Sequence, residues 1–495
     1  MKTRVATPAA DANSSADQSI AKPRGPVRTV ADLPGPKPLP LLGNAHQIDS
    51  AQFHLQLENW SKQYGAAYKI HLGSKQIVVL SDVNVIGGLL RDRPDAFRRA
   101  SRTIRILAEV GTAGLFTAEG EEWRKQRKLV MRALTPEVIR NFFPTMSMMT
   151  ERLLVRWHDA LAAGRTVDIL RDLKAYTLDV TIGLAMGQDI NTLEHDNNPL
   201  QRDIEQLFHR VGRRVTSPIA YWRYFKLPVD RAAEASSKRI GETVREFVEQ
   251  ARKRLAEHPE CRQKPGNMLE ALVVARDETG SEFTDAHVIG NAVTMVFAGE
   301  DTTSNTIAWM LDFIARDPRA AACLAREADE VLGADKVLAD YASLDRFRYT
   351  EAATDEAMRL KPVASLVTFE SNRELMVGDL QVASNTVLIG LLRPAGQNEA
   401  AFPQAEIFRP ERWLAGEATP ANDNPGRKLF PFGGGPRFCP GRFLAMAEIK
   451  MVVSMLVRNF ELSIDPAAPP VKELYTFTIT PSALPVILKA RSAIK

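Results

Sequence analysis

One segment of the chain, from Thr284 to Pro318, constrains the fold more than any other. Its apolar residues recur every three or four positions, Thr284 suits the N-cap position of a helix, and Asp317-Pro318 provides a stop signal. The segment predicts a helix of roughly 32 residues, about 48 Å long at 1.5 Å per residue. Such a helix would cross the whole molecule, so the other elements must pack around it.

Most of the remaining sequence also has helical periodicity, and we predict a mainly α fold of the α+β class with small sheets near both ends. Apolar residues at helical spacing, with charges between them, fill the blocks 120–134, 138–163, 168–187, 198–213 and 230–257. A short helix over 53–64 precedes a predicted β-hairpin of 67–72 and 76–80. Later strand-like segments lie at 375–377, 387–391, 460–464 and 484–488.

Composition excludes several classes of protein. The 495 residues include 64 Lys and Arg against 60 Asp and Glu, an excess too small for a general nucleic-acid binder. The three cysteines are too widely spaced for a disulfide framework or a zinc site, so we expect a reducing, cytoplasmic compartment. Residues 1–30 lack an apolar run, and no stretch of 18 apolar residues occurs. We therefore expect a disordered tail over 1–30, no membrane anchor and a single domain over 31–495.

The centre of the long helix, Ala298 to Thr303, is polar and lies between two apolar runs. Buried polar groups cost free energy unless they are paired. One interpretation is a solvent-facing stripe or a kink at Gly299. The other is a local opening of the helix beside a ligand, with Asp301 and Thr302 pointing at it. This pattern alone favours neither.

The strongest chemical signal is a glycine-rich loop that contains a cysteine and runs from Phe432 to Arg442. Its glycines allow positive φ and a close approach to a flat ligand. A phosphate-binding loop is the main alternative, but the motif G-x-x-x-x-G-K-[ST] is missing. Cys439 directly precedes a segment with helical periodicity, where free N–H groups and the helix dipole favour a thiolate, and a thiolate can ligate haem iron. An inert buried thiol would explain the other two cysteines but not the glycines and the arginine around this one.

The loop resembles the haem-binding loop of the cytochrome P450 family, F-x-x-G-x-R-x-C-x-G. The matching residues are Phe432, Gly435, Arg437, Cys439 and Gly441. Four further motifs of the family follow its order: Trp123–Arg127 (W-x-x-x-R), Ala298–Thr303 (oxygen activation), Glu356–Arg359 (E-x-x-R) and Phe408–Trp413. The resemblance covers roughly residues 33 to 488 and implies the cytochrome P450 fold, formed by a single catalytic domain.

The resemblance also implies a role for each matched residue. Cys439 would be the axial ligand of a haem b iron. Thr302 would hold a water by a hydrogen bond, and Asp301 (or Glu300) would relay protons from solvent. The haem would contact Trp123, Arg127, Ala298, Phe432, Gly435, Arg437 and Gly441, with Trp123, Arg127 and Arg437 on a propionate.

Two further points concern the support of the haem. Glu356, Arg359 and Arg412 would form a buried ion-pair cluster with a structural role. Family members often place an arginine after the K-P step to bind the second propionate, but residues 367–370 contain no basic side chain. The partners of that propionate are therefore unassigned.

By similarity, the substrate would contact mostly aliphatic, small and hydroxyl residues, so a moderately lipophilic organic molecule is expected. The segments concerned are 99–116, 293–302, 363–367 and 476–478. The aromatic segment 220–225 is expected in the core or at the access lip rather than at a membrane.

We expect no flavin- or iron–sulfur-binding extension after the matched region. Electrons from NAD(P)H would therefore come through a ferredoxin reductase and a ferredoxin. The ferredoxin would dock on the basic face 124–132. We expect a monomeric monooxygenase of the soluble bacterial type, which inserts one oxygen atom from O₂ by hydroxylation or a related oxidation. A peroxide-driven or rearranging haem-thiolate enzyme is one alternative, against which the intact Asp301-Thr302 pair argues. A non-enzymatic helical binding protein with an inert Cys439 is the other.

Overall fold

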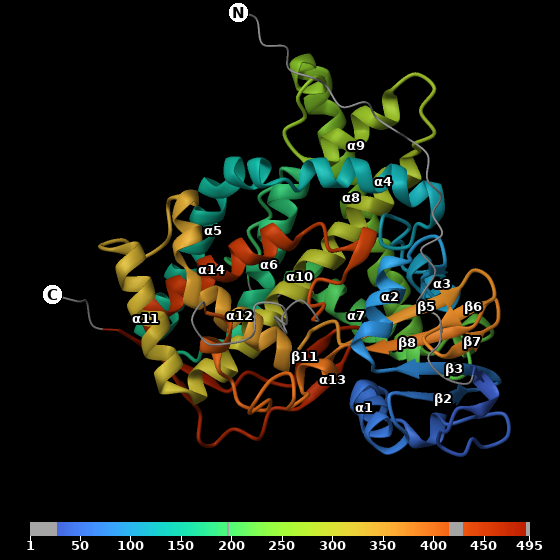
Figure 1. The fold of residues 1–495 in the computed structure, drawn as a ribbon. Helices are drawn as coiled ribbons and strands as arrows, with labels where there is room; N and C mark the ends of the chain where they lie inside the picture. Colours follow the sequence, from blue (N-terminus) through green and yellow to red (C-terminus); the bar gives the residue numbers. More distant parts are fainter. Residues whose placement is uncertain (1–26, 196–197, 415–428, 492–495) are drawn as a thin grey trace, which may run out of the picture.

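The long helix predicted from the sequence is present as α10 (Asp285–Arg316), which runs through the middle of the molecule (Figure 1). The computed structural model describes residues 27–195, 198–414 and 429–491. The Thr284 hydroxyl accepts a hydrogen bond from the His287 N–H (3.3 Å), and the His287 ring accepts one from the Thr284 N–H (3.1 Å). These two bonds cap the first turn. Asp317 ends α10 and caps the next helix, α11 (Pro318–Leu332).

Several helices pack against α10 in the main hydrophobic core. α6 (Ile169–Met186) is buried around nearly its whole circumference, and α14 (Arg442–Asn459) packs against both α10 and α12 (Arg348–Leu360). The remaining helices are α1 (Phe53–Tyr64), α2 (Val83–Arg91), α3 (Ser101–Ala108), α4 (Gly120–Ala133), α5 (Pro136–Ala162), α7 (Pro199–Thr216), α8 (Pro228–Glu257), α9 (Met268–Asp277) and α13 (Arg393–Gly396).

The largest sheet lies at one side of the helices, at the right of Figure 1, with the strand order β2-β3-β8-β5-β4. β3 and β8 are parallel, and the other neighbours are antiparallel. A second hydrophobic core, which includes Phe97 and Phe369, packs against this sheet. The strands of the sheet are β2 (Ala67–Leu72), β3 (Lys75–Leu80), β4 (Phe97–Arg98), β5 (Leu366–Ser371) and β8 (Val387–Leu391).

One of the three smaller sheets in the described part of the chain joins a segment near the N-terminus to a segment from the later part of the chain, and the other two pair late segments with each other. β1 (Arg28–Thr29) runs parallel to β7, and Arg28 forms an ion pair with Asp379 at 2.7 Å. The folded part therefore begins before residue 31, where the tail was expected to end; residues 1–26 lie outside the described residues. The other strands are β6 (Leu375–Val377), β7 (Leu380–Val382), β9 (Phe460–Ile464), β10 (Glu473–Tyr475), β11 (Ile479–Pro481) and β12 (Val486–Ala490).

The segment 99–116, one of those expected around the substrate, contains α3. Glu370 in β5 caps this helix from a distant part of the chain: its carboxylate accepts hydrogen bonds from the Ser101 N–H (2.7 Å) and the Ser101 hydroxyl (3.0 Å). A cap that comes from another element leaves no local trace in the sequence. Among the described residues, no helix has both the length and the apolar character needed to cross a membrane.

Candidate active site

The glycine-rich loop folds back onto the end of α2 and presents Cys439 at the start of α14. Gly433 and Gly435 have φ of +72° and +64°, in the left-handed region that favours glycine. A side chain on Gly435 would also overlap the carbonyl oxygen of Leu90. The Cys439 N–H donates to the Phe432 carbonyl (2.9 Å), which closes the loop. The sequence motif thus forms one rigid turn around the cysteine.

The electrostatic surroundings of Cys439 partly correct the sequence interpretation. Burial raises the pKa of the Cys439 thiol, although the N–H groups of Gly441 and Arg442 and the charge of Arg127 act in the opposite direction. The helix end therefore does not favour the thiolate by itself, because desolvation outweighs it. Since a metal ion deprotonates a coordinating thiol outright, the same donors would then stabilise the charged sulfur.

The polar centre of α10 is neither a solvent-facing stripe nor an opening of the helix. Glu300 and Asp301 are buried, and the helix is continuous through this region. The Thr302 hydroxyl donates to the Ala298 carbonyl (2.8 Å), as an ordinary bond within the helix. Gly299 serves close packing, because a side chain there would overlap Thr181 on α6.

A chain of charged groups connects Asp301 to the surface. The Asp301 carboxylate accepts a short hydrogen bond from the Thr478 hydroxyl and lies 3.8 Å from the Lys174 ammonium. Lys174 in turn donates to Glu205 (3.0 Å), whose side chain reaches solvent. Burial lowers the pKa of Lys174, but the carboxylates around it raise the pKa further, so it stays charged. Sequence reasoning missed Lys174 and Glu205, which no motif marks, and placed Thr478 only in the pocket wall.

Glu300, the alternative proton carrier, has different surroundings. Its carboxyl group is fully buried, and neither oxygen has a hydrogen-bond partner. Burial raises the pKa of Glu300 well above its ordinary value, because desolvation disfavours the charged form. Because Asp301 is connected to solvent and Glu300 is not, the geometry favours Asp301 as the relay.

Three arginines from different segments gather around one carboxylate, that of Glu119. Arg437 donates to it at 2.5 Å, Arg93 lies 3.5 Å away, and the Arg99 backbone N–H donates at 2.9 Å. Burial, together with the charges of Arg93 and Arg437, lowers the pKa of Arg99 well below its ordinary value. Nε of Arg437 and both Nε and Nη2 of Arg93 are buried without a hydrogen-bond partner. The cluster has two positive charges in excess and fits a ligand with two negative charges.

The two residues of the W-x-x-x-R motif, Trp123 and Arg127, contact different parts of the site. The Trp123 ring lies beneath the guanidinium of Arg437, 4.7 Å from ring centre to carbon, and Trp123 is therefore part of the arginine cluster. Arg127 instead donates to the Phe438 carbonyl at 2.5 Å, next to Cys439. The guanidinium of Arg127 is thus already bonded to the cysteine loop and lies outside the arginine cluster, so Arg437 fits the expected contact with a propionate better than Arg127 does.

Glu356 in α12 is fully buried and holds the segment before the cysteine loop. Arg359 donates to both of its carboxylate oxygens at 2.8 Å, and Arg412 donates at 2.9 Å. The Trp413 indole (2.8 Å) and the Arg409 N–H (2.9 Å) complete the set. The structure thus brings together the three residues of the expected cluster, and it adds two donors from η7 (Pro410–Trp413) and the residue before it.

Comparison with known proteins identifies the family. The family model "Cytochrome P450" matches residues 33–488. The chain belongs to the cytochrome P450 family. It is similar to Protein LUTEIN DEFICIENT 5, chloroplastic, of Arabidopsis thaliana (24% identical; 90% of this chain and 75% of that protein). It is also similar to Probable cytochrome P450 4d21 of Drosophila melanogaster (23% identical; 93% of both). A self-sufficient cytochrome P450 monooxygenase of Aspergillus kawachii is 27% identical over 91% of this chain, which spans only 42% of that protein.

As a cytochrome P450, the protein is an oxidoreductase of the monooxygenase class with haem b as its cofactor. The site fits this group. Cys439 offers one soft donor, Gly435 keeps the loop free of a side chain, and the surplus charge of the arginine cluster equals that of two propionates. Arg93, Arg99 and Arg437 would hold these carboxylates, and the first two would supply the partners that residues 367–370 lack.

Proposed function

We propose that this P450 oxidises a moderately lipophilic small molecule with O₂ and with electrons from a separate redox protein. One observation carries the proposal: the buried Asp301, next to Thr302, is connected to solvent by Lys174 and Glu205. A monooxygenase must deliver protons to O₂ while the O₂ is reduced, and this arrangement provides an entry for those protons. A peroxide-driven enzyme, the main alternative, needs no such supply.

The residues around the site would each contribute a separate step. Haem, when bound, supplies the binding and reduction of O₂. Cys439 would donate electron density from its sulfur, and the arginine cluster would fix the orientation of the ring. Asp301 would pass a proton from Lys174 toward Thr302, and the Thr302 hydroxyl would rotate from the Ala298 carbonyl to hold a water.

The walls expected around the substrate support a lipophilic one. Phe116 meets Phe477 (ring centres 6.2 Å apart), and Phe208 meets Phe297 (5.2 Å). Phe297 lies in segment 293–302 and Phe477 in segment 476–478, both of which similarity places around the substrate. Aromatic side chains in these segments suit an apolar molecule that is held by shape rather than by charge.

The electron donor and the compartment remain predictions. Ferredoxin and its reductase are the expected donors, whereas the similar Aspergillus protein is named a self-sufficient monooxygenase. The cytoplasmic location is likewise expected from composition alone, and one relative is named as chloroplastic. Membership of the family removes the non-enzymatic alternative.

The test of the proton supply is Thr302→Ala, studied with a compound chosen because it produces the low- to high-spin shift. We expect the spin shift and the CO-bound spectrum to persist, product per NADPH to fall several-fold, and peroxide to rise in proportion. Thr306→Ala is the matched control, because its hydroxyl also bonds to a helix carbonyl (Thr302, 2.8 Å). An unchanged ratio of product to NADPH in Thr302→Ala, or turnover with added peroxide that exceeds turnover with NADPH, contradicts the proposal.

A further inference from the structure

The turn between β10 and β11, residues 476–478, joins the expected substrate site to the buried Asp301. The Thr478 hydroxyl donates a short hydrogen bond to Oδ2 of Asp301, while Oδ1 lies 3.8 Å from the Lys174 ammonium. The two oxygens of this carboxylate therefore have different partners, one neutral and one charged. Similarity places Thr478 around the substrate, but no motif gives it a part in the supply of protons.

Side-chain hydrogen bonds fix β11 and the turn before it along one face of α10. The first is the bond from Thr478 to Asp301. One helical turn further on, the Asn305 amide donates to the Thr480 hydroxyl (3.0 Å). After another turn, the Trp309 indole donates to a backbone carbonyl of β11 (3.0 Å). Because the other bonds remain when one is removed, the effect of the Thr478 hydroxyl can be tested with the strand in place.

The tip of the turn has an unusual backbone and faces the expected substrate. Phe477 has φ of +88°, in the left-handed region that side chains disfavour, and the Thr476 N–H donates to the Thr478 carbonyl (2.9 Å). The Phe477 ring meets that of Phe116, whose segment is also expected around the substrate. A molecule bound there would contact the same turn that holds Asp301.

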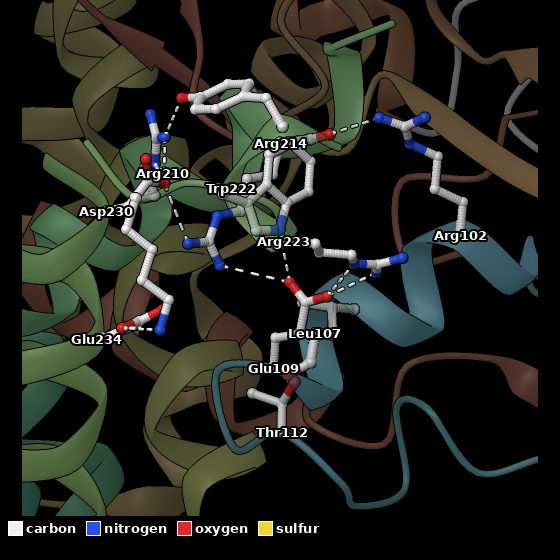
Figure 2. Close-up of polar contacts among 12 residues, drawn as sticks. Arg102, Leu107, Glu109, Thr112, Arg210, Arg214, Trp222, Arg223, Asp230 and Glu234 are labelled. Atoms are coloured by element: carbon white, nitrogen blue, oxygen red, sulfur yellow. Dashed lines mark hydrogen bonds and ion pairs between the residues drawn. The ribbon is translucent and has the colours of Figure 1, made fainter. Parts of the chain in front are cut away.

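The helix α7 packs against the turn as well. A Cβ on Gly212 would come within 2.9 Å of the Phe477 nitrogen, so the missing side chain allows this close contact. The end of α7 is itself held in place: Figure 2 shows Arg210 and Arg214 beside Asp230, with which both form ion pairs. The turn therefore lies between α7 and α10, and its Thr478 hydroxyl reaches the carboxylate on α10.

We propose that Thr478 is a positioning residue for the proton relay. Its hydroxyl holds the Asp301 carboxylate beside Lys174, and its place on the turn makes this position depend on the bound substrate. The inference rests on the proposed function, in which Asp301 passes protons toward Thr302. The Thr478 hydroxyl donates its one hydrogen to Asp301 and neither gains nor loses a proton. Without it, Oδ2 of Asp301 would lose this donor inside the protein, and Lys174 would draw the carboxylate toward itself.

Thr478→Val tests the proposal, because it removes the hydroxyl and nearly keeps the shape of the side chain. The haem-loaded enzyme is saturated with a compound that produces the spin shift. We expect product formation to slow roughly tenfold, since a hydrogen bond to a charged group contributes about that factor. The solvent deuterium isotope effect on product formation should increase, because proton delivery becomes slower relative to the other steps. Thr478→Ser, which keeps the hydroxyl, should restore both values.

Thr480→Val is the matched control. Thr480 is as buried as Thr478 and also bonds to α10, but its partner Asn305 is uncharged. This variant should lose stability in urea without any increase in the isotope effect. Equal isotope effects in Thr478→Val and Thr480→Val would overturn the proposal. A crystal structure of Thr478→Val should show β11 in place and the Asp301 carboxylate turned toward Lys174; an unmoved carboxylate would also overturn it.

Asp301→Asn separates a failure of this inference from a failure of the proposed function. If Thr478 acts through the carboxylate, Thr478→Val should add little to the loss already caused by Asp301→Asn. A full further loss in the double variant would overturn the positioning role and leave the relay intact. An Asp301→Asn variant with unchanged product per NADPH would overturn the relay, and the role of Thr478 with it. The CO-bound spectrum of each variant checks that the haem site is intact.

Discussion

At the residue scale, two glycines of the cysteine loop have similar backbone conformations but different surroundings. Gly433 and Gly435 both have positive φ, which costs a residue with a side chain about 1–2 kcal/mol. A Cβ on Gly433 would meet nothing within 4 Å, whereas one on Gly435 would overlap the Leu90 carbonyl. Only Gly435 therefore needs both the conformation and the missing side chain.

This difference predicts the outcome of a matched pair of substitutions. Gly433→Ala should lower the free energy of unfolding by about 1–2 kcal/mol and retain haem. Gly435→Ala should cost about 3 kcal/mol or more and give protein with little haem, because the loop must move away from α2. Urea unfolding and the haem-to-protein absorbance ratio measure the two effects. Equal haem content in the two variants would contradict the role assigned to the Leu90 contact.

Single residues also show what a sequence can reveal about a site. Cys439, Asp301 and Thr302 lie within short motifs, where neighbours along the chain carry the chemistry, and so they could be proposed directly. Arg93 and Lys174 could not, because their partners belong to segments that only the fold brings near. A pattern along one segment holds no information about a charge supplied by another.

At the scale of elements, α6 and the loop that follows it are joined by a buried carboxylate. Asp179 accepts hydrogen bonds from the Thr192 N–H (2.9 Å) and the Thr192 hydroxyl (2.8 Å). Burial nevertheless raises the pKa of Asp179 to about 6, against 3.8 ordinarily. The folded state therefore retains this proton at a pH where the unfolded chain has lost it. The resulting stability is complete below about pH 4 and is lost as the pH rises through 6.

Asp179→Asn should remove this pH dependence. The free energy of unfolding of the natural protein should fall between pH 4.5 and 7 by about 2 kcal/mol from this group, and the variant should lose that slope. Asp189→Asn is the control: Arg152 lowers the pKa of Asp189, so its contribution is constant in this window and declines only in stronger acid. Urea unfolding by circular dichroism at several pH values measures both. A slope that persists in Asp179→Asn would refute the assignment.

The elements themselves were predictable to the extent that their signals are local. α10 carries its own cap and stop residues, and the hairpin of β2 and β3 has strong strand formers around a glycine turn, so both were expected nearly as found. α3 was not, because Glu370 from β5 caps it. β5 was missed for a related reason: its pairing with β8 and β4 is what makes it a strand.

At the scale of the whole molecule, we expect electrons to enter through the face around the cysteine loop. Arg127 on α4 donates to the backbone of the cysteine loop, and this bond holds the helix against the loop. The exposed side of α4 and the exposed residues Arg442 and Phe443, which follow the loop, therefore belong to the same surface. The structure narrows the basic face expected over 124–132. Arg124 and Lys125 are already paired with Asp95, Glu121 and Glu282, while Lys128 and Arg132 form no ion pair in the parts of the chain that are described.

An acidic redox partner should therefore depend on Lys128 and not on Lys125. Lys128→Glu should slow the reduction of the enzyme by ferredoxin about tenfold at low salt, and the difference should shrink as salt shortens the range of the charges to a few ångströms. Lys125→Gln should have little effect, because Glu282 already neutralises that charge. Stopped-flow reduction under CO at two salt concentrations measures these rates. Reduction that is insensitive to salt would contradict this prediction, because it would show that the positive face does not steer the partner.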